Sequence, residues 1–363
     1  MKVPFIDFSY ELEEFENNFS HLLNDHLKKG EFIGGESVKN FEDKLQEYLG
    51  VNHVVTVGNG TDALLIALLS LGLKNKEVIV PAFSFFATSE AVVQAGLKPV
   101  FVDIEYDNCN IDVSKIEQKI TAETGAILPV HLFGNSADMK AIQELSSSYN
   151  LKIVEDVAQS FGTKYKNKQL GTIGDFGCFS FFPTKTLGAY GDGGAIATND
   201  SELAETARMY KNHGSKIKYF NEVFGYNSRL DSIQASILSL KLEKIDLWIK
   251  KRIEAGKYYD NELKEVEEIA LLNNENSSYN YYSLFVKNNQ RDSLRDFLSS
   301  KNISTAIYYP KTLPSLPAHN ESSYDFPIAE NICKEIVSLP IWPGIEKKQL
   351  IYVIESIKEF FKI

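Results

Sequence analysis

Residues 54–71 read VVTVGNGTDALLIALLSL, and this stretch decides the fold class. A short β-branched run at 54–57 predicts a buried strand, and the apolar run from Ala63 to Leu71 predicts a helix. A glycine-rich turn, Gly58 to Asp62, joins them. This order directs free backbone N–H groups and the positive end of a helix toward an anion. The turn therefore predicts either a phosphate-binding loop or a helix N-terminus capped by Thr61 or Asp62.

The alternation of strands and helices continues along the chain. Further strands are predicted at 77–80, 99–103, 126–132, 151–154 and 178–182, with helices at 87–95 and 139–149. Strands separated by helical segments of about 10–15 residues indicate βαβ units. We expect an α/β fold with a mostly parallel mixed sheet sandwiched by helices, and in such sheets ligands bind beyond the carboxyl ends of the strands.

The two ends of the chain have a different pattern. Residues 8–50 predict two helices around a Phe32–Gly35 turn, and residues 229–266 predict one long charged helix. A strand at 279–286, a helix at 291–299, a strand at 307–309 and a helix at 350–361 predict a smaller α+β domain. We expect a large domain at 1–240, a small domain at 241–363, and packing of the first ~30 residues on the small domain. The segment 310–324, rich in Pro, Ser and Asn, is expected to line a site or an interface.

Composition narrows the class of protein. The chain has 363 residues, 44% hydrophobic and 24% charged, which is typical of an ordinary globular protein. Its formal net charge of −11 argues against broad nucleic-acid binding. No signal peptide or membrane span is evident, and the three scattered cysteines predict neither a disulfide framework nor a zinc site. We expect a cytoplasmic protein without a metal, a nucleic-acid partner or a membrane partner.

A second stretch, residues 180–194, reads SFFPTKTLGAYGDGG and places Lys185 between an aromatic run and a glycine-rich loop. A lysine where an apolar strand gives way to a tight turn is poorly solvated, which favours its neutral, nucleophilic form. Such a lysine suits a Schiff base with a carbonyl, although an exposed loop lysine is the alternative interpretation. Thr61, Phe85, His131 and Asp156 lie at the carboxyl ends of predicted strands, and Lys185 lies at the exit of the 178–182 strand. We therefore expect these five residues to meet at one edge of the sheet.

Pyridoxal phosphate needs the groups that this edge would offer. It requires a lysine for the Schiff base, a carboxylate on the pyridine nitrogen, and donors for a phosphate. Lys185, Asp156 and the Gly60-Thr61 turn supply one of each. The sequence thus predicts a pyridoxal phosphate site that uses these residues.

The chain resembles the DegT-type nucleotide-sugar aminotransferases, which depend on pyridoxal phosphate and have the fold type I of the aspartate aminotransferase superfamily. Seven segments carry the resemblance, in the family's order, through the first two-thirds of the chain. They are Gly60–Leu64, Pro99–Asp103, Pro129–Gly134, Glu155–Ser160, Ser180–Lys185, Gly191–Ala195 and Tyr226–Asp231.

The resemblance implies a role for each matching residue. Lys185 would bond to the coenzyme and shuttle a proton, while Asp156 would pair with the pyridine nitrogen. The other coenzyme contacts would be Gly60, Thr61 and Ser180 on the phosphate, Gln159 at the 3′-oxygen and Phe85 stacked on the ring. Asn227 would reach the phosphate of a partner subunit, so that a homodimer would share its active sites. His213, Arg229, Tyr308 and Tyr309 would face the substrate.

The implied reaction transfers an amino group in two halves. L-Glutamate would convert the coenzyme to pyridoxamine phosphate and leave as 2-oxoglutarate, and the pyridoxamine form would aminate a keto sugar linked to a nucleotide. The segment Thr305–Pro310 is similar to that of members acting at C3, although many of those have His-Tyr where this chain has Tyr308-Tyr309. The whole chain is most similar to members that act on UDP-2-acetamido-3-oxo-glucuronate, and in these Arg229 would meet the uronate carboxylate. A dTDP-3-oxo-6-deoxyhexose and a 4-keto sugar stay open, and such sugars serve polysaccharide or lipopolysaccharide O-antigen synthesis.

Two other classes of protein compete with this interpretation. A nicotinamide dehydrogenase also uses parallel βαβ units, and the Gly58–Ala63 turn fits its relaxed fingerprint, but Val80-Pro81-Ala82 stands where the acidic ribose ligand is expected. A non-catalytic regulator on the same scaffold would not need Lys185.

Overall fold

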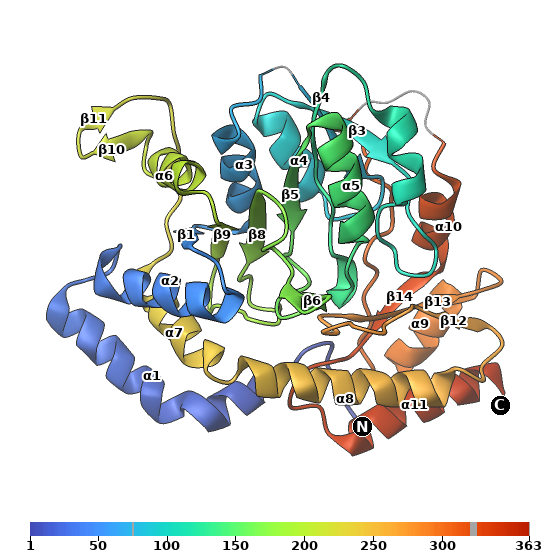
Figure 1. Cartoon of the computed structure of the whole chain (residues 1–363). Coiled ribbons are helices and arrows are strands. Elements are labelled where there is room, and N and C mark those ends of the chain that lie inside the picture. The colour runs from blue at the N-terminus through green and yellow to red at the C-terminus, as the bar shows by residue number, and fades with distance from the viewer. Residues whose placement is uncertain (75, 320–324, 363) are drawn as a thin grey trace.

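The computed structural model describes residues 1–74, 76–319 and 325–362, so residues 320–324 of the predicted 310–324 segment lie outside it. A seven-stranded sheet runs in the order β1-β9-β8-β5-β4-β2-β3 (Figure 1). Its strands are β1 (His53–Val57), β2 (Glu77–Pro81), β3 (Lys98–Val102), β4 (Thr124–Ile127), β5 (Lys152–Asp156), β8 (Phe176–Ser180) and β9 (Gly194–Thr198). The five strands from β8 to β3 pair in parallel, whereas β9 is antiparallel to β1 and β8. The mostly parallel mixed sheet is confirmed.

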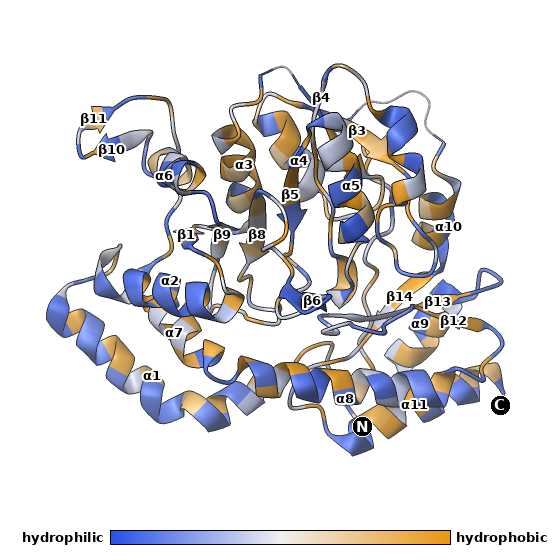
Figure 2. Cartoon of the chain, in the orientation of Figure 1, coloured by the Kyte–Doolittle hydropathy of each residue, from blue (hydrophilic) through white to orange (hydrophobic). Residues whose placement is uncertain are grey.

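Both faces of this sheet are buried. Val55 packs in one cluster with α3 (Gly60–Ser70), while its neighbour Val54 packs in another cluster with Phe41 of α2 (Gly35–Leu49). Successive side chains of a strand point to opposite faces, so two buried faces require the continuous apolar strands seen in the sequence. Figure 2 shows α3 as hydrophobic over most of its length, whereas α1 and α8 have hydrophilic faces.

Helices flank the sheet on both sides. The helices of the first two-thirds of the chain are α1 (Ser9–Lys29), α2, α3, α4 (Ala87–Gln94), α5 (Met139–Tyr149), α6 (Ser201–Tyr210) and α7 (Ser232–Leu242). Those toward the C-terminus are α8 (Ile245–Leu263), α9 (Arg291–Ser300), α10 (Pro327–Glu335) and α11 (Lys347–Phe361). No helix of the described ranges is long and apolar enough to cross a membrane.

A small antiparallel sheet forms in the C-terminal part from β12 (Ile269–Leu271), β13 (Tyr282–Val286) and β14 (Ile336–Leu339). Its cluster of buried side chains includes residues of α8, α9 and α11, and Figure 1 shows α8 and α11 running along one side of it. Val3 pairs with Ile303 near this sheet, while the ring of Phe15 in α1 lies 5.9 Å from that of Trp248 in α8. A division into domains at residue 240 stays a prediction.

Four expectations about individual elements are wrong. The strand expected at 126–132 ends at Ile127, because Pro129 has no N–H to donate. The strand expected at 178–182 covers 176–180 instead, since the Phe181 N–H bonds to the carbonyl of Gly193 in the following loop. The single long helix is two helices, α7 and α8, and residues 307–309 form no strand.

The described chain also has two short hairpins, β6 (Lys164–Tyr165) with β7 (Lys168–Gln169) and β10 (Ser215–Ile217) with β11 (Phe220–Asn221), and three short 3-10 helices at Val113–Lys115, Glu117–Lys119 and Leu132–Gly134. Figure 1 shows the β10–β11 hairpin standing away from the large sheet, beyond α6.

Candidate active site

Lys185 lies in the loop that follows β8, where its backbone N–H donates to the Phe182 carbonyl at 2.8 Å. The loop turns back so tightly that a Cβ on Gly188 would lie 2.3 Å from the Pro183 carbonyl oxygen, which only glycine avoids. The backbone N–H and the hydroxyl of Thr186 both bond to Asn280 of the C-terminal part. The loop that carries the lysine is thus held by its own tight turn and by Asn280.

Asp156 ends β5, and its side chain is 5% exposed. One carboxylate oxygen accepts from the Ala158 N–H at 3.1 Å and the other from the Thr88 hydroxyl at 3.0 Å. Burial raises the pKa of Asp156, and these hydrogen bonds and the positive charge of Lys185 oppose the rise. The carboxylate and the lysine are therefore close enough for their charges to interact.

Gly60 and Ser180 touch each other at the start of α3. A Cβ on Gly60 would lie only 2.7 Å from the Ser180 Cβ, so the first turn of α3 rests against the end of β8. The side chain of Asn59 caps this helix by accepting from the Asp62 N–H at 2.8 Å, which corrects the expected capping by Thr61 or Asp62. Thr61 stands in the first turn, half-buried, beside this contact. The arrangement offers backbone and hydroxyl donors at a helix N-terminus, as an anion requires.

Gln159, Tyr309 and Phe85 form a second group of predicted residues. The Gln159 amide nitrogen donates to the Tyr309 hydroxyl at 2.8 Å, and its carbonyl oxygen accepts from the Phe133 N–H at 3.1 Å. The ring of Phe85 lies 5.9 Å from that of Tyr309 and is 55% exposed. Burial raises the pKa of the Tyr309 hydroxyl well above its ordinary value, so this hydroxyl is a neutral donor and acceptor.

Tyr281 belongs to the site although the sequence did not single it out. The Lys185 Nζ lies 5.6 Å from the centre of its ring, and its hydroxyl is 3.2 Å from the hydroxyl of Thr184. The ring of Tyr308 packs against it at 4.5 Å. Tyr281 sits in an aromatic run of a predicted strand, and no motif marks it, because its contacts come from elements distant in the chain.

His213, Asn227 and Arg229 are exposed on the segment between α6 and α7. The His213 N–H bonds to the Tyr226 carbonyl, and Asn227 pairs with Asn212, so these contacts stay within that segment. The segment is anchored next to α3 by Ser228, whose hydroxyl accepts from the Gly58 N–H at 2.9 Å and donates to Asp62 at 2.6 Å.

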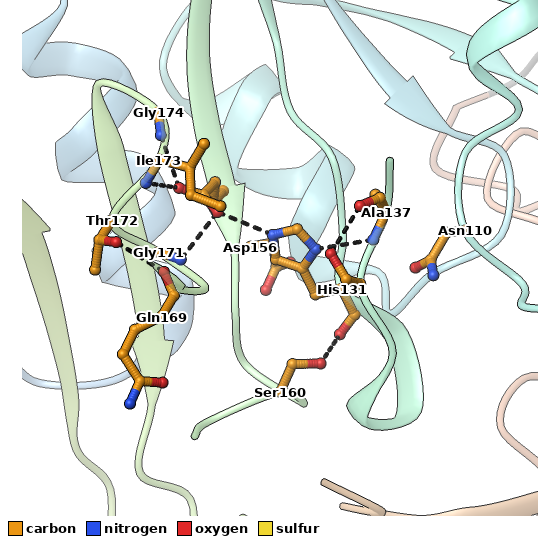
Figure 3. A network of polar contacts seen from close by, with 12 residues as sticks. Asn110, His131, Ala137, Asp156, Ser160, Gln169, Gly171, Thr172, Ile173 and Gly174 are labelled. Carbon is orange, nitrogen blue, oxygen red and sulfur yellow. Dashed lines mark hydrogen bonds and ion pairs between the residues drawn. The ribbon is translucent and has the colours of Figure 1, made fainter. Parts of the chain in front are cut away.

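His131 follows a residue that pairs with Asp156 at the sheet edge, as expected, but its side chain turns into the interior. Its side chain is fully buried, with Nε2 donating to Glu155 at 3.1 Å and Nδ1 accepting from the Ala137 N–H at 3.2 Å (Figure 3). Because Nδ1 accepts a hydrogen bond, the ring proton sits on Nε2. Glu155 also accepts from the backbone N–H groups of Gly171, Ile173 and Gly174 at 2.7 to 2.9 Å. This network fixes β5 one residue before Asp156.

The set of groups fits pyridoxal phosphate. An amine at Lys185, a carboxylate at Asp156 and a helix N-terminus beside Ser180 come from three neighbouring points of one sheet edge, which matches the coenzyme's aldehyde, ring nitrogen and phosphate. The same edge does not suit a nicotinamide dinucleotide. In a dinucleotide fold the strand before the glycine turn is central, whereas β1 lies at the border of the sheet and pairs only with the antiparallel β9.

Comparison with known proteins identifies a family. Residues 13–358 match the model of the DegT/DnrJ/EryC1/StrS aminotransferase family. A crystal structure of S. venezuelae DesV in complex with a ketimine intermediate superposes with a TM-score of 0.95 at 36% identity, covering 100% of this chain and 99% of that one.

Three curated relatives extend over nearly the whole chain. The "Pleiotropic regulatory protein" of Geobacillus stearothermophilus is 41% identical over 100% of this chain and 99% of that protein. The dTDP-3-amino-3,4,6-trideoxy-alpha-D-glucose transaminase of Streptomyces venezuelae is 37% identical over 99% of this chain and 96% of its own length. The UDP-2-acetamido-2-deoxy-3-oxo-D-glucuronate aminotransferase of Pseudomonas aeruginosa is 37% identical over 95% and 96%.

Proposed function

This chain belongs to the DegT/DnrJ/EryC1/StrS aminotransferase family, and we propose that it moves an amino group from L-glutamate to C3 of a UDP-2-acetamido-3-oxo-glucuronate-like sugar. It is an aminotransferase that depends on pyridoxal phosphate and acts on nucleotide sugars. The observation that carries the proposal is the placement of Asp156 at the end of β5 and of Lys185 in the loop after the neighbouring parallel strand β8.

Each residue of the site has a proposed task. When bound, pyridoxal phosphate supplies an aldehyde that takes up the amino group and a ring that accepts electrons from the reacting carbon. Asp156 holds the ring nitrogen in its protonated form, since a buried carboxylate favours a cation beside it. Lys185 holds and returns the proton at its Nζ, and the flexible side chain suits this movement. Gly60, Thr61 and Ser180 bind the phosphate, while Gln159 and Phe85 orient the ring.

Arg229 supports the choice of a uronate. Its side chain is exposed, and its positive charge helps to lower the pKa of Lys211, so the guanidinium is not used up by a partner that hides it from solvent. A carboxylate on the sugar suits an arginine, which can bind both oxygens at once. Tyr308 and Tyr309 would hold the sugar nucleotide by their rings and hydroxyls. The named activities of the relatives support UDP and dTDP sugars alike, so a dTDP-3-oxo-6-deoxyhexose is the second candidate, and a 4-keto sugar the third.

A homodimer would complete the site. The hairpin segment exposes large apolar side chains, which single chains rarely leave in water. They are Ile217 (71%), Tyr219 (88%), Phe220 (69%) and Phe224 (102%). We propose that this surface packs on a second copy of the chain, where Asn227 reaches the phosphate and His213 the substrate of the partner. We assign the reaction to the cytoplasm, in the supply of amino sugars for polysaccharide such as lipopolysaccharide O-antigen, and the three free, buried thiols suit a reducing compartment.

A panel of keto sugars tests the substrate. The pyridoxamine form of the protein is mixed with UDP-linked and dTDP-linked 3-keto and 4-keto sugars, and the return of the pyridoxal absorbance identifies the substrate. We expect the UDP-3-oxo-glucuronate to give the fastest return. An Arg229→Met variant should lose most of its rate with the uronate and keep its rate with a neutral hexose.

A non-catalytic regulator is the alternative from another class, and the name of the Geobacillus relative favours it. Such a protein has no use for the amine of Lys185, so a Lys185→Ala variant separates the two functions.

A further inference from the structure

Two hydroxyl groups beneath Asp156 have no part in the proposed reaction. Thr88 belongs to the first turn of α4 and is fully buried, and Ser84 belongs to the loop before α4 and is 3% exposed. Their oxygens are 2.8 Å apart, and the Thr88 hydroxyl donates to Asp156 at 3.0 Å. The three residues therefore form a continuous chain of hydrogen bonds inside the protein.

The direction of this chain is fixed. A hydroxyl has a single proton, and Thr88 uses it on Asp156, so the proton between the two hydroxyls must come from Ser84. Ser84 donates to Thr88 and Thr88 donates to Asp156, and each bond polarises the next. An ionised carboxylate, which only accepts, is the form of Asp156 that this direction suits.

Thr88 is also the one side chain that hydrogen-bonds to Asp156 among the described residues. The second carboxylate oxygen is held by a backbone N–H, that of Ala158. With one donor on each oxygen, each oxygen still has a free lone pair that can accept a further hydrogen bond.

The backbone of Thr88 performs a separate task. Its N–H donates to the carbonyl of Phe85 at 3.1 Å, which closes the turn that carries the Phe85 ring. The side chain and the backbone of one residue thus act on Asp156 and on the segment of Phe85. A change from threonine to valine removes the hydroxyl and keeps both the backbone bond and the side-chain volume, so it isolates the first task.

We propose that Thr88, oriented by Ser84, is a positioning residue that aims the Asp156 carboxylate at the ring nitrogen of the coenzyme and stabilises its negative charge. This inference rests on the proposed function, since it needs a pyridoxal phosphate site at Asp156. Burial raises the pKa of Asp156 and the Thr88 hydrogen bond opposes the rise, which agrees with this role.

The test measures coenzyme binding rather than turnover. Apoprotein of the full chain is titrated with pyridoxamine phosphate, which forms no covalent bond to Lys185. We expect Thr88→Val to raise the dissociation constant for pyridoxamine phosphate about tenfold, the effect of losing one hydrogen bond to a charged group. The absorption band of bound pyridoxal phosphate should also shift. Thr88→Ser should restore both values to within about twofold of wild type.

Thr198→Val is the matched control. The Thr198 hydroxyl, at the end of β9 remote from Gly194, is buried and donates to the Asp175 carbonyl at 2.8 Å. The Thr198→Val variant should lower the melting temperature of the protein about as much as Thr88→Val does. Its affinity for the coenzyme and the absorption band of the bound coenzyme should stay as in wild type. If Thr88→Val does not fold, Ser84→Ala tests the same chain of hydrogen bonds. The dissociation constant for pyridoxamine phosphate should then rise about two- to threefold.

The outcomes separate the two proposals. Wild-type protein that binds no pyridoxal phosphate would overturn the proposed function and this inference with it. Wild-type protein that binds the coenzyme, together with hydroxyl-free variants of unchanged affinity and spectrum, would overturn the role of Thr88 and leave the proposed function intact.

Discussion

The side-chain amide of Gln159 donates a 2.8 Å hydrogen bond to the hydroxyl of Tyr309, 150 residues further along the chain. Gln159 follows β5 closely after Asp156, and Tyr309 belongs to the segment proposed to bind the sugar. The bond therefore connects the part of the site that would hold the coenzyme to the part that would hold the substrate.

Tyr309→Phe removes this connection. The Gln159 amide then loses its acceptor while burial persists, so we expect the KM for the nucleotide sugar to rise about fivefold, the effect of one neutral hydrogen bond. Steady-state kinetics measure the change. Tyr106→Phe is the control, because it deletes the hydroxyl that bonds to Glu335 outside the proposed site. A normal KM in Tyr309→Phe would contradict the role of this bond.

Lys185→Ala should lower turnover by about a thousandfold or more, because the proposed mechanism uses this amine to move the proton. The measurements are the rate of amino transfer and the mass of the protein after borohydride treatment with pyridoxal phosphate, which labels the wild-type lysine alone. Lys140→Ala, which removes an exposed lysine near Glu144, serves as the control. Full activity without Lys185 would end the proposed mechanism, and an unchanged biological effect without turnover would favour the regulator.

The dimer proposal predicts complementation. Lys185→Ala and Asn227→Ala chains are each inactive in their own dimers if Asn227 serves the partner's site. Random mixing makes half of the dimers mixed, and each mixed dimer has one site with both native residues, so about a quarter of the wild-type activity should return. The activity of refolded mixtures and their mass by sedimentation check this. Full activity of a monomer would exclude the shared site.

Lys211 predicts a dependence of stability on pH. Burial lowers its pKa to about 8, although the charge of Glu42 opposes this. Below pH 8 the lysine is charged in both the folded and the unfolded chain, and burying this charge destabilises the folded chain. Between pH 8 and the unfolded value of about 10.4, the unfolded chain binds a proton that the folded chain has released, so stability rises with pH.

The comparison with Lys211→Met isolates this effect. From pH 7.5 to 9.5, the free energy of unfolding of wild type should gain on the order of 1–2 kcal/mol relative to the variant, as measured in urea. A difference between the two proteins that does not change with pH would show that Lys211 keeps its proton when folded.

Glu155→Ala should destabilise the protein by about 3–5 kcal/mol, because three backbone N–H groups and His131 lose their acceptor in the interior. Glu123→Ala, at an exposed side chain 3.8 Å from Lys76, should change stability by less than about 0.5 kcal/mol. Urea unfolding measures both. Equal effects of the two changes would mean that water replaces the Glu155 carboxylate in the network of Figure 3.

The βα units could be predicted from the sequence because each is defined locally. Periodicity and turn residues locate β1, α3, β2, α4 and β3 to within a few residues, and they correctly place Asp156 at the end of a strand and Lys185 after one. Elements defined by distant partners could not be predicted in this way. β12 and β14 are short and become strands only by pairing with β13, and the break between α7 and α8 falls in a helical sequence without Gly or Pro.

The same limit applies to side chains. The sequence predicts the position of His131 at the sheet edge but not the direction of its side chain. The ring lies in the interior because it bonds to the Glu155 carboxylate and to the Ala137 N–H. Tyr281 was missed because its relation to Lys185 exists only once the small sheet packs beside the large one. A local pattern carries neither fact.

Gly60 and Ser180 press together where α3 meets β8, in the first two-thirds of the chain, while Tyr281, Tyr308 and Tyr309 come from the last third. A Cβ on Gly60 would collide with Ser180, so neither the helix nor the strand can move closer, whereas the tyrosines are held by rings and single hydrogen bonds from separate segments. In the proposed function, the phosphate of the coenzyme would therefore be bound by a part of the fold that tolerates little change, while the residues proposed for the sugar could be exchanged without disturbing it.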